Sequence, residues 1–149
     1  MKNNDMGRPI EILLVEDSVS DAKLTMKSLA NGKIANNLHW VEDGETAIAY
    51  LKNEQQYPDA LRPDLIILDL NLPGMDGREV LAEIKSDQNL KIIPIVIVTS
   101  SNDEEDIYRS YNLHANCFVT KPVELEQFLQ VVQLIENFWL VAVKLPTVS

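Results

Sequence analysis

Residues 65–77 have the sequence LIILDLNLPGMDG. The four apolar residues that open this segment predict a strand buried on both faces, because a half-exposed strand would alternate polar and apolar side chains. Pro73 and Gly74 predict a turn soon after the strand. Asp69 then stands at the strand's carboxyl end, which is the edge where open parallel α/β sheets bind their ligands. A lone Asp before such a turn is often structural, so its meaning depends on the other strand ends.

The composition is typical of a single globular domain. The chain has 149 residues, 46% of them hydrophobic and 24% charged, which is enough for one core. We expect the domain at residues 10–140, an N-terminal arm at residues 1–9 and a C-terminal tail at residues 141–149. The sequence contains neither a bilayer-spanning apolar run nor a signal peptide, so we expect a cytoplasmic protein without membrane contact. The net charge of −10 argues against nucleic acid as a partner, because such binding needs clustered Lys and Arg.

Five apolar segments alternate with helical patterns along the chain. The expected strands are Ile10–Val15, Leu38–Val41, Leu65–Leu68, Ile92–Val98 and Asn116–Thr120. This alternation predicts an α/β fold, namely a flavodoxin-like, doubly wound parallel sheet of order 2-1-3-4-5 with helices on both faces. The mixed polarity of the second strand suits a sheet edge, and we interpret its His39 and Trp40 as ordinary strand residues. The switch point of such a sheet lies between its first and third strands.

Polar side chains follow four of the strands, at Glu16 and Asp17, Asp69, Thr99, and Lys121. Three carboxylates at one edge repel each other, and a divalent cation would remove that conflict. Hard oxygen donors without Cys or His indicate Mg²⁺ rather than zinc. Asp69 is the natural nucleophile, since carboxylates can form an aspartyl phosphate. Thr99 and Lys121 would then share the charge of the phosphoryl oxygens with the cation. The peptide bond between Lys121 and Pro122 is a candidate for the cis form.

The last expected helix, residues 123–140, has an unusually wide apolar surface. Its apolar residues cover about 260° of the circumference, whereas packing on one sheet needs a stripe of about 100°. Either the tail at residues 141–149 folds back over this surface, or the surface contacts another protein.

Taken together, the strand-end residues resemble those of the receiver domain of two-component response regulators, over roughly residues 10–138. The resemblance implies that the phosphoacceptor is Asp69. It assigns the other roles to the metal ligands Glu16, Asp17, Asp69 and Asn71 (through its backbone carbonyl), the phosphoryl contact Lys121, and the switch residues Thr99 and Phe118. Phe118 stands where many relatives have Tyr, so this aromatic switch cannot use a hydroxyl. A receiver catalyses only its own phosphorylation and dephosphorylation, so we do not expect an enzyme in the usual sense.

A finer resemblance lies in the segments LNLP at 70–73, GREVL at 77–81 and FWL at 138–140. These are similar to segments of the small stand-alone response regulators that are paired with cyanobacterial phytochrome histidine kinases. The resemblance implies a phytochrome-type sensor histidine kinase as phosphoryl donor and a homodimer formed through the fourth helix, fifth strand and fifth helix. For this interface we expect contributions from Phe128, Val132, Ile135 and Trp139. The 11 residues that follow residue 138 are too few for an output domain, so we also expect a downstream protein partner or a phosphotransfer protein.

Three rival interpretations use the same features. A phosphohydrolase of the haloacid-dehalogenase type needs a second Asp two residues after the nucleophile, where this chain has Asn71. A flavodoxin-like cofactor binder needs a glycine-rich phosphate loop, where this chain has EDSVS at residues 16–20. The remaining alternative is a pseudo-receiver that acts as an interaction module without phosphorylation. Such a protein would be marked by a broken acidic site, and here each acid is present.

Overall fold

The structure is a computed structural model, and it describes residues 9–30, 35–53, 60–99 and 117–120, together with Glu126 and Gln130. Of Thr99, Cys117, Phe118 and Thr120 it describes the backbone only. The elements are β1 Ile10–Val15, α2 Val19–Ala30, β2 Asn36–Val41, α3 Gly44–Leu51, β3 Leu65–Leu68, α4 Gly77–Ser86, β4 Ile95–Thr99 and β5 Cys117–Thr120. Glu126 and Gln130 are exposed helical residues within the expected last helix. The rest of that helix, residues 1–8 of the N-terminal arm and the C-terminal tail lie outside the described residues.

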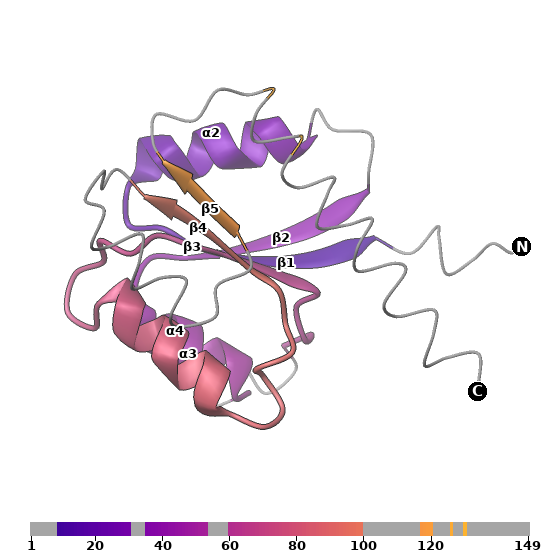
Figure 1. Ribbon diagram of the computed structural model, residues 1–149. Coiled ribbons are helices and arrows are strands. Elements are labelled where there is room, and N and C mark those ends of the chain that lie inside the picture. The colour runs from indigo at the N-terminus through magenta and orange to yellow at the C-terminus, as the bar shows by residue number, and fades with distance from the viewer. Residues whose placement is uncertain are drawn as a thin grey trace, which may run out of the picture.

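The five strands form one parallel sheet in the order β2-β1-β3-β4-β5 (Figure 1). Residues 10–15 of β1 pair with residues 36–41 of β2, and residues 12–15 pair on the other side with residues 65–68 of β3. The chain thus leaves β1 for the edge strand β2 and returns to β3 on the opposite side of β1. The expected sheet order and the edge position of β2 are confirmed, and the switch point lies between β1 and β3.

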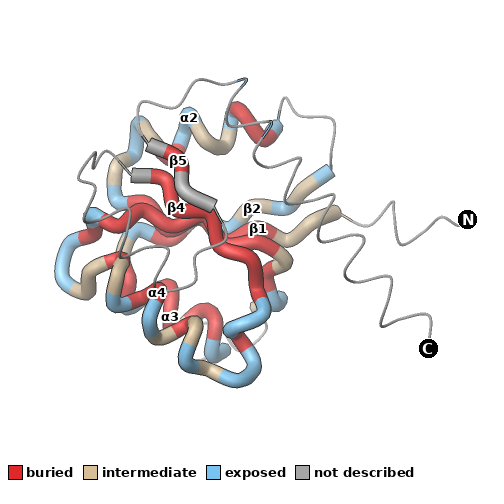
Figure 2. The backbone as a smooth tube through the Cα atoms, in the orientation of Figure 1, coloured by how far each residue is buried: buried red, intermediate tan, exposed pale blue. Residues whose placement is uncertain are grey.

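Helices cover both faces of the sheet, with α2 on one face and α3 and α4 on the other (Figure 1). Successive residues of β1 therefore point into different cores. Leu13 and Val15 pack in the cluster under α3 and α4, whereas Ile12 and Leu14 pack in the cluster under α2. All four are buried, and Figure 2 shows burial along most of the central strands. This double burial explains why the strands are continuous apolar runs.

Two apolar residues, Ile92 and Leu24, are exposed to solvent. The expected strand Ile92–Val98 begins only at Ile95, and Ile92 is 74% exposed. The reason is Pro94, which lacks the N–H that a central strand needs; its carbonyl oxygen still accepts the Ile66 N–H at 3.0 Å. In α2, the large apolar residue Leu24 is 52% exposed. At 100° per residue it points away from the side of the helix that faces the sheet.

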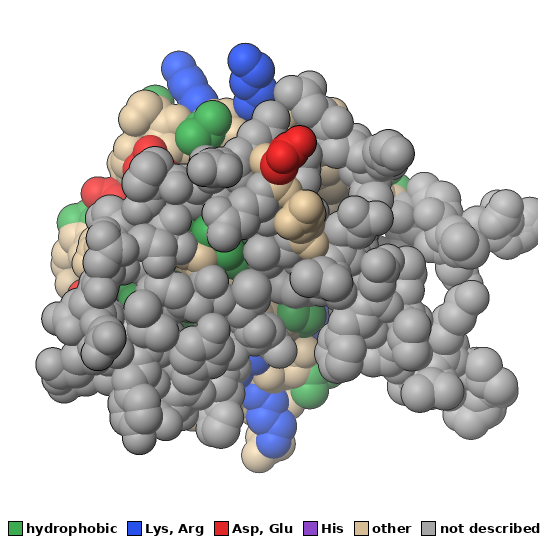
Figure 3. Space-filling model, turned by 45° about the horizontal axis from the view of Figure 1, so that its top comes forward, with side chains coloured by type: hydrophobic (Ala, Val, Ile, Leu, Met, Phe, Trp, Pro, Cys, Tyr) green, Lys and Arg blue, Asp and Glu red, His purple; other side chains and the backbone are tan. Residues whose placement is uncertain are grey.

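No helix among the described residues is long and apolar enough to cross a membrane. On the face in Figure 3, the described Lys and Arg side chains stand at the upper and lower margins, with other side chain types between them.

Candidate phosphoacceptor and metal site

The carboxyl ends of β1 and β3 bring together three acids. Glu16 and Asp17 follow β1, and Asp69 follows β3, the neighbouring strand in the sheet. One carboxylate oxygen from each of the three lies within 4.8 Å of the others. Glu16 and Asp69 are 2% and 5% exposed, whereas Asp17 is open to solvent. Two of the three acids are therefore buried, and the third is accessible to solvent. The three lie at the switch point, where doubly wound sheets bind ligands.

Backbone hydrogen bonds continue the sheet one residue past these strands. The Asp69 N–H donates to the Val15 carbonyl oxygen at 3.0 Å, and the Glu16 N–H donates to the Val41 carbonyl oxygen at 3.0 Å. A single peptide group, the one between Val15 and Glu16, therefore joins Asp69 on one side to β2 on the other. The backbone amides of the two buried acids are therefore part of the hydrogen bonding of the central sheet.

The side chain of each buried acid accepts a hydrogen bond from a backbone amide of the loop that follows it. Asp69 Oδ1 accepts the Asn71 N–H at 2.9 Å, and Glu16 Oε2 accepts the Ser18 N–H at 3.1 Å. In each case the donor is the amide two residues downstream, as in an Asx turn. A carboxylate that is bound to its own departing loop stays at the strand end instead of turning away into solvent.

The start of α4 fixes the loop that leaves Asp69. The Gly77 N–H donates to the Leu70 carbonyl oxygen at 3.0 Å. A Cβ atom on Gly77 would collide with the Asp69 carbonyl oxygen and would lie 2.5 Å from Leu70 Cα, so glycine is required for this approach. Asp76 caps the helix by accepting the Arg78 N–H at 2.8 Å, and Glu79 Oε1 accepts the Asp76 N–H at 3.3 Å, completing a capping box. The helix start thus holds the Asp69 backbone from the other side.

The chemistry of the donors suits a hard divalent cation. All three donors are carboxylate oxygens, and neither Cys nor His belongs to the group. Three negative charges at this separation repel each other, and a divalent ion bound between them would offset that repulsion. Mg²⁺ and Mn²⁺ both accept such oxygen ligands. The described residues therefore fit the metal site that the sequence predicted.

The other predicted site residues are placed only in part. Asn71 is exposed in the loop after Asp69, beside the acids. Thr99 ends β4 and pairs with Thr120 of β5, and Phe118 of β5 pairs with Ile97. The structure describes only the backbone of Thr99 and Phe118. The remaining predicted residues lie outside the described part of the chain, namely Lys121, Pro122, Phe128, Val132, Ile135 and Trp139. Their roles stay predictions.

One residue that contacts this site was not singled out by the sequence. The indole N–H of Trp40, in β2, donates to the Glu16 carbonyl oxygen at 2.7 Å. The sequence pattern indicates only an ordinary strand residue at this position. The register of β2 against β1 brings its side chain to the acidic turn, and no motif signals that contact.

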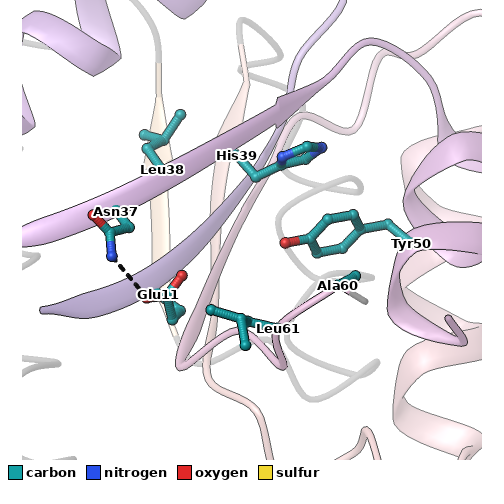
Figure 4. A pocket seen from close by; sticks show the side chains of 7 residues that line it. All are labelled: Glu11, Asn37, Leu38, His39, Tyr50, Ala60 and Leu61. Atoms are coloured by element: carbon teal, nitrogen blue, oxygen red, sulfur yellow. Dashed lines mark hydrogen bonds between the residues drawn. The ribbon is translucent and has the colours of Figure 1, made fainter. Parts of the chain in front are cut away.

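A second hollow lies away from the acids, beside the edge strand (Figure 4). Its volume is about 330 Å³, and its lining residues are Glu11, Asn37, Leu38, His39, Tyr50, Ala60 and Leu61. The rings of His39 and Tyr50 stack with their centroids 4.4 Å apart. The Asn37 amide donates to Glu11 Oε2 at 2.9 Å between directly paired residues of β2 and β1. The single acid that lines it is thus already hydrogen-bonded to a neighbouring side chain.

A flavodoxin-like sheet with three acids at its switch point defines a class of phosphoryl-accepting signalling domains. Within that class, the family model described as response regulator receiver domain matches residues 12–133. The chain belongs to this family.

Two proteins that resemble this chain extend over nearly its whole length. Response regulator Rcp1 of Synechocystis sp. is 46% identical over 144 residues, which are 97% of this chain and 98% of that protein. The crystal structure of the phosphorylated cyanobacterial phytochrome response regulator RcpA is 52% identical, with a TM-score of 0.79 over 89% of this chain and 95% of that one. A crystal structure of Rcp1 in its Mn²⁺-bound form is 48% identical, with a TM-score of 0.78 over 88% and 94% of the two chains.

Proposed function

We propose that this response regulator accepts a phosphoryl group on Asp69 in the presence of Mg²⁺, and that the donor is a histidine kinase of the phytochrome type. The observation that carries the proposal is the convergence of Glu16, Asp17 and Asp69 on one point of a receiver fold. The similarity to RcpA, a phytochrome response regulator, supports the class of donor.

The residues that would hold the cation are the three acids, joined by the backbone carbonyl of Asn71. When bound, Mg²⁺ would offset the negative charge of the acids and of the incoming phosphoryl group. The Mn²⁺-bound form of Rcp1 supports a divalent ion, and the preference for Mg²⁺ rests on the all-oxygen donor set. The hydrogen bonds from Ser18 and Asn71 would keep Glu16 and Asp69 aimed at the shared point before any ligand arrives.

In the transfer itself, a carboxylate oxygen of Asp69 attacks the phosphorus atom of the donor's phosphohistidine. A new oxygen–phosphorus bond forms, the phosphorus–nitrogen bond breaks, and the histidine nitrogen keeps the electron pair. We assign Lys121 and Thr99 to the phosphoryl oxygens, with Phe118 responding to the position of Thr99. The protein turns over no separate substrate, so we do not count it as an enzyme. It would act in the cytoplasm, because a kinase needs ATP to make its phosphohistidine.

The proposal includes a second copy of the chain and a downstream protein as partners. Phe128, Val132, Ile135 and Trp139 would form the dimer face, and support for this comes from the apolar width of residues 123–140 in the sequence. Sedimentation velocity at tens of micromolar, with and without phosphorylation, checks the dimer. A monomer under both conditions would exclude it.

The test of phosphoryl acceptance is the intact mass of the protein after incubation with acetyl phosphate, with and without Mg²⁺. We expect a Mg²⁺-dependent gain of about 80 Da, one phosphoryl group, in the wild type and none in Asp69→Asn. Asp64→Asn is the matched control, because it removes the same charge from the opposite end of the same strand and should be labelled like the wild type. Failure of the wild type to gain mass, while a known receiver does so, would favour a pseudo-receiver interaction module.

A further inference from the structure

Trp40, in β2, donates a hydrogen bond to the turn at Glu16 and Asp17, which follows the neighbouring strand β1. It is the second-last residue of the edge strand β2, paired with Leu14 of β1. Its indole N–H donates to the Glu16 carbonyl oxygen at 2.7 Å, at the short end of the range for N–H···O bonds. That carbonyl belongs to the peptide group that links Glu16 to Asp17, the two acids that follow β1.

Both backbone polar groups of Glu16 are held by β2. The Glu16 N–H donates to the Val41 carbonyl oxygen, and the Glu16 carbonyl accepts from Trp40. Glu16 is 2% exposed, so solvent has little access to replace a lost donor at its carbonyl. Rotation of the Glu16–Asp17 peptide would therefore cost this hydrogen bond. The exposed Asp17 has no comparable burial to fix it, and its position depends on the peptide group that precedes it.

We propose that Trp40 is a positioning residue for the divalent cation. Through the Glu16 carbonyl, its indole N–H fixes the orientation of the Glu16–Asp17 peptide, and thereby the place of the Asp17 carboxylate relative to Glu16 and Asp69. This inference rests on the cation site of the proposed function. Since the indole is bonded to the turn that holds the ion, cation binding also alters the surroundings of Trp40, which makes it a built-in fluorescent reporter of occupancy.

A purely structural role for Trp40 predicts a different outcome. Trp40 packs against the cluster under α2, as does Leu38, which lies two residues earlier on the same face of β2. Leu38 donates no side-chain hydrogen bond, so Leu38→Ala removes packing from the same strand and face while leaving the Glu16 carbonyl its donor. Trp40→Phe keeps an aromatic ring and removes the N–H.

The experiment measures Mn²⁺ binding to the full chain by the electron paramagnetic resonance signal of the unbound ion. We expect Trp40→Phe to weaken the Mn²⁺ Kd by about tenfold, as the loss of a group that orients metal ligands does, and Leu38→Ala to change it by less than about twofold. Equal affinity of Trp40→Phe and wild type, or equal weakening in both variants, overturns the proposal. A wild type that binds no Mn²⁺ refutes the cation site itself, so the two failures are distinguishable.

A second measurement keeps the proposal testable if Trp40→Phe does not fold. The chain has two tryptophans, so Trp139→Phe leaves Trp40 as its only indole. Titration of this variant with Mg²⁺ should change the Trp40 emission, and the change should be half complete at the Kd found by calorimetry. The change should disappear in the additional variant Glu16→Gln. Emission that stays constant while calorimetry records binding would contradict the inferred coupling.

Discussion

Acidic residues flank the β1–β3 pair at both ends, but only those at the carboxyl end converge on one point. Glu11 and Asp64 lie at the amino ends of the paired segments, and Glu16 and Asp69 lie at the carboxyl ends, five residues later in each strand. At the amino end the acids are tied to neighbours: Asp64 Oδ2 accepts the Glu11 N–H at 2.9 Å, and Glu11 Oε2 accepts from Asn37 at 2.9 Å. At the carboxyl end they converge within 4.8 Å.

The difference shows that two acids side by side in a sheet do not make a site. Convergence depends on the path of the chain after each acid. Beyond Glu16 and Asp69 the chain turns, and the amides of Ser18 and Asn71 hold the carboxylates at the sheet edge. The chain then leaves for α2 on one face and for α4 on the other (Figure 1), which is the arrangement at the ligand-binding edge of doubly wound sheets. The amino end lacks such departing turns, because there the strands begin.

The largest effect should come from breaking the packing behind Asp69. Gly77→Ala places a methyl group against the backbone of Asp69 and Leu70, so α4 or the loop has to shift. We expect the free energy of unfolding to fall by about 3 kcal/mol, measured by urea denaturation, and labelling by acetyl phosphate to slow by about tenfold or more.

Gly74→Ala is the control for this variant. Gly74 has a positive φ of 66°, but the nearest atoms to an added Cβ belong to the Glu45 side chain, which can move. A loss of about 1 kcal/mol with wild-type labelling is expected. If Gly77→Ala were labelled as fast as Gly74→Ala, the contact behind Asp69 would not position it.

Removal of one carboxylate charge from each end of β1 should affect cation binding only at the carboxyl end. Glu16→Gln should weaken the Mn²⁺ Kd by about tenfold or more, roughly 1.4 kcal/mol, because it takes a charged oxygen from the convergent group. Glu11→Gln removes the same charge from the same strand and should change the Kd by less than about twofold. Calorimetry measures both. Equal weakening would mean that the overall negative field, and not convergence, attracts the ion.

The smallest expected effect concerns a cation at the amino end. Lys85 Nζ donates to the carbonyl oxygens of Lys91 at 2.8 Å and Ile93 at 3.0 Å, just before β4. Lys85→Met removes both hydrogen bonds, and we expect a loss of about 1 kcal/mol in the free energy of unfolding with unchanged Mn²⁺ affinity. Weaker Mn²⁺ binding in this variant would show that the two ends are coupled.

Lys85 should also give the stability a dependence on pH. Burial lowers the pKa of Lys85 below its ordinary value of 10.5. Between the lowered pKa and 10.5, the unfolded chain therefore holds more protons than the folded chain, and this group's contribution to stability rises with pH. The rise should be smaller in Lys85→Met when the two proteins are compared by urea denaturation from about pH 8 to about pH 10.5.

The sequence was sufficient for the strands and for the acidic group, because both depend on patterns that are local to each strand, and the sheet order followed from the alternation of strands and helices. Continuous apolar runs locate buried strands, and an acid directly after such a run must lie at the sheet edge. The contact between Trp40 and Glu16 could not be predicted, since it depends on the register of two strands and on one side-chain rotamer. The late start of β4 was predictable in principle, because Pro94 lacks the donor that a strand interior requires.

The hydrogen bond from the Asp69 amide to the Val15 carbonyl has a consequence for hydrogen exchange. An amide that is bonded between two central, fully covered strands exchanges with solvent only when the sheet itself opens, so Asp69 should be among the slowest amides of the chain. The amide of the exposed Asn71, two residues later, donates to the Asp69 side chain and not to a neighbouring strand. The proposed phosphoacceptor therefore lies on backbone that is hydrogen-bonded into the centre of the sheet. Under the proposed function, a conformational response to phosphorylation would therefore involve the groups around Asp69 and not the backbone that carries it.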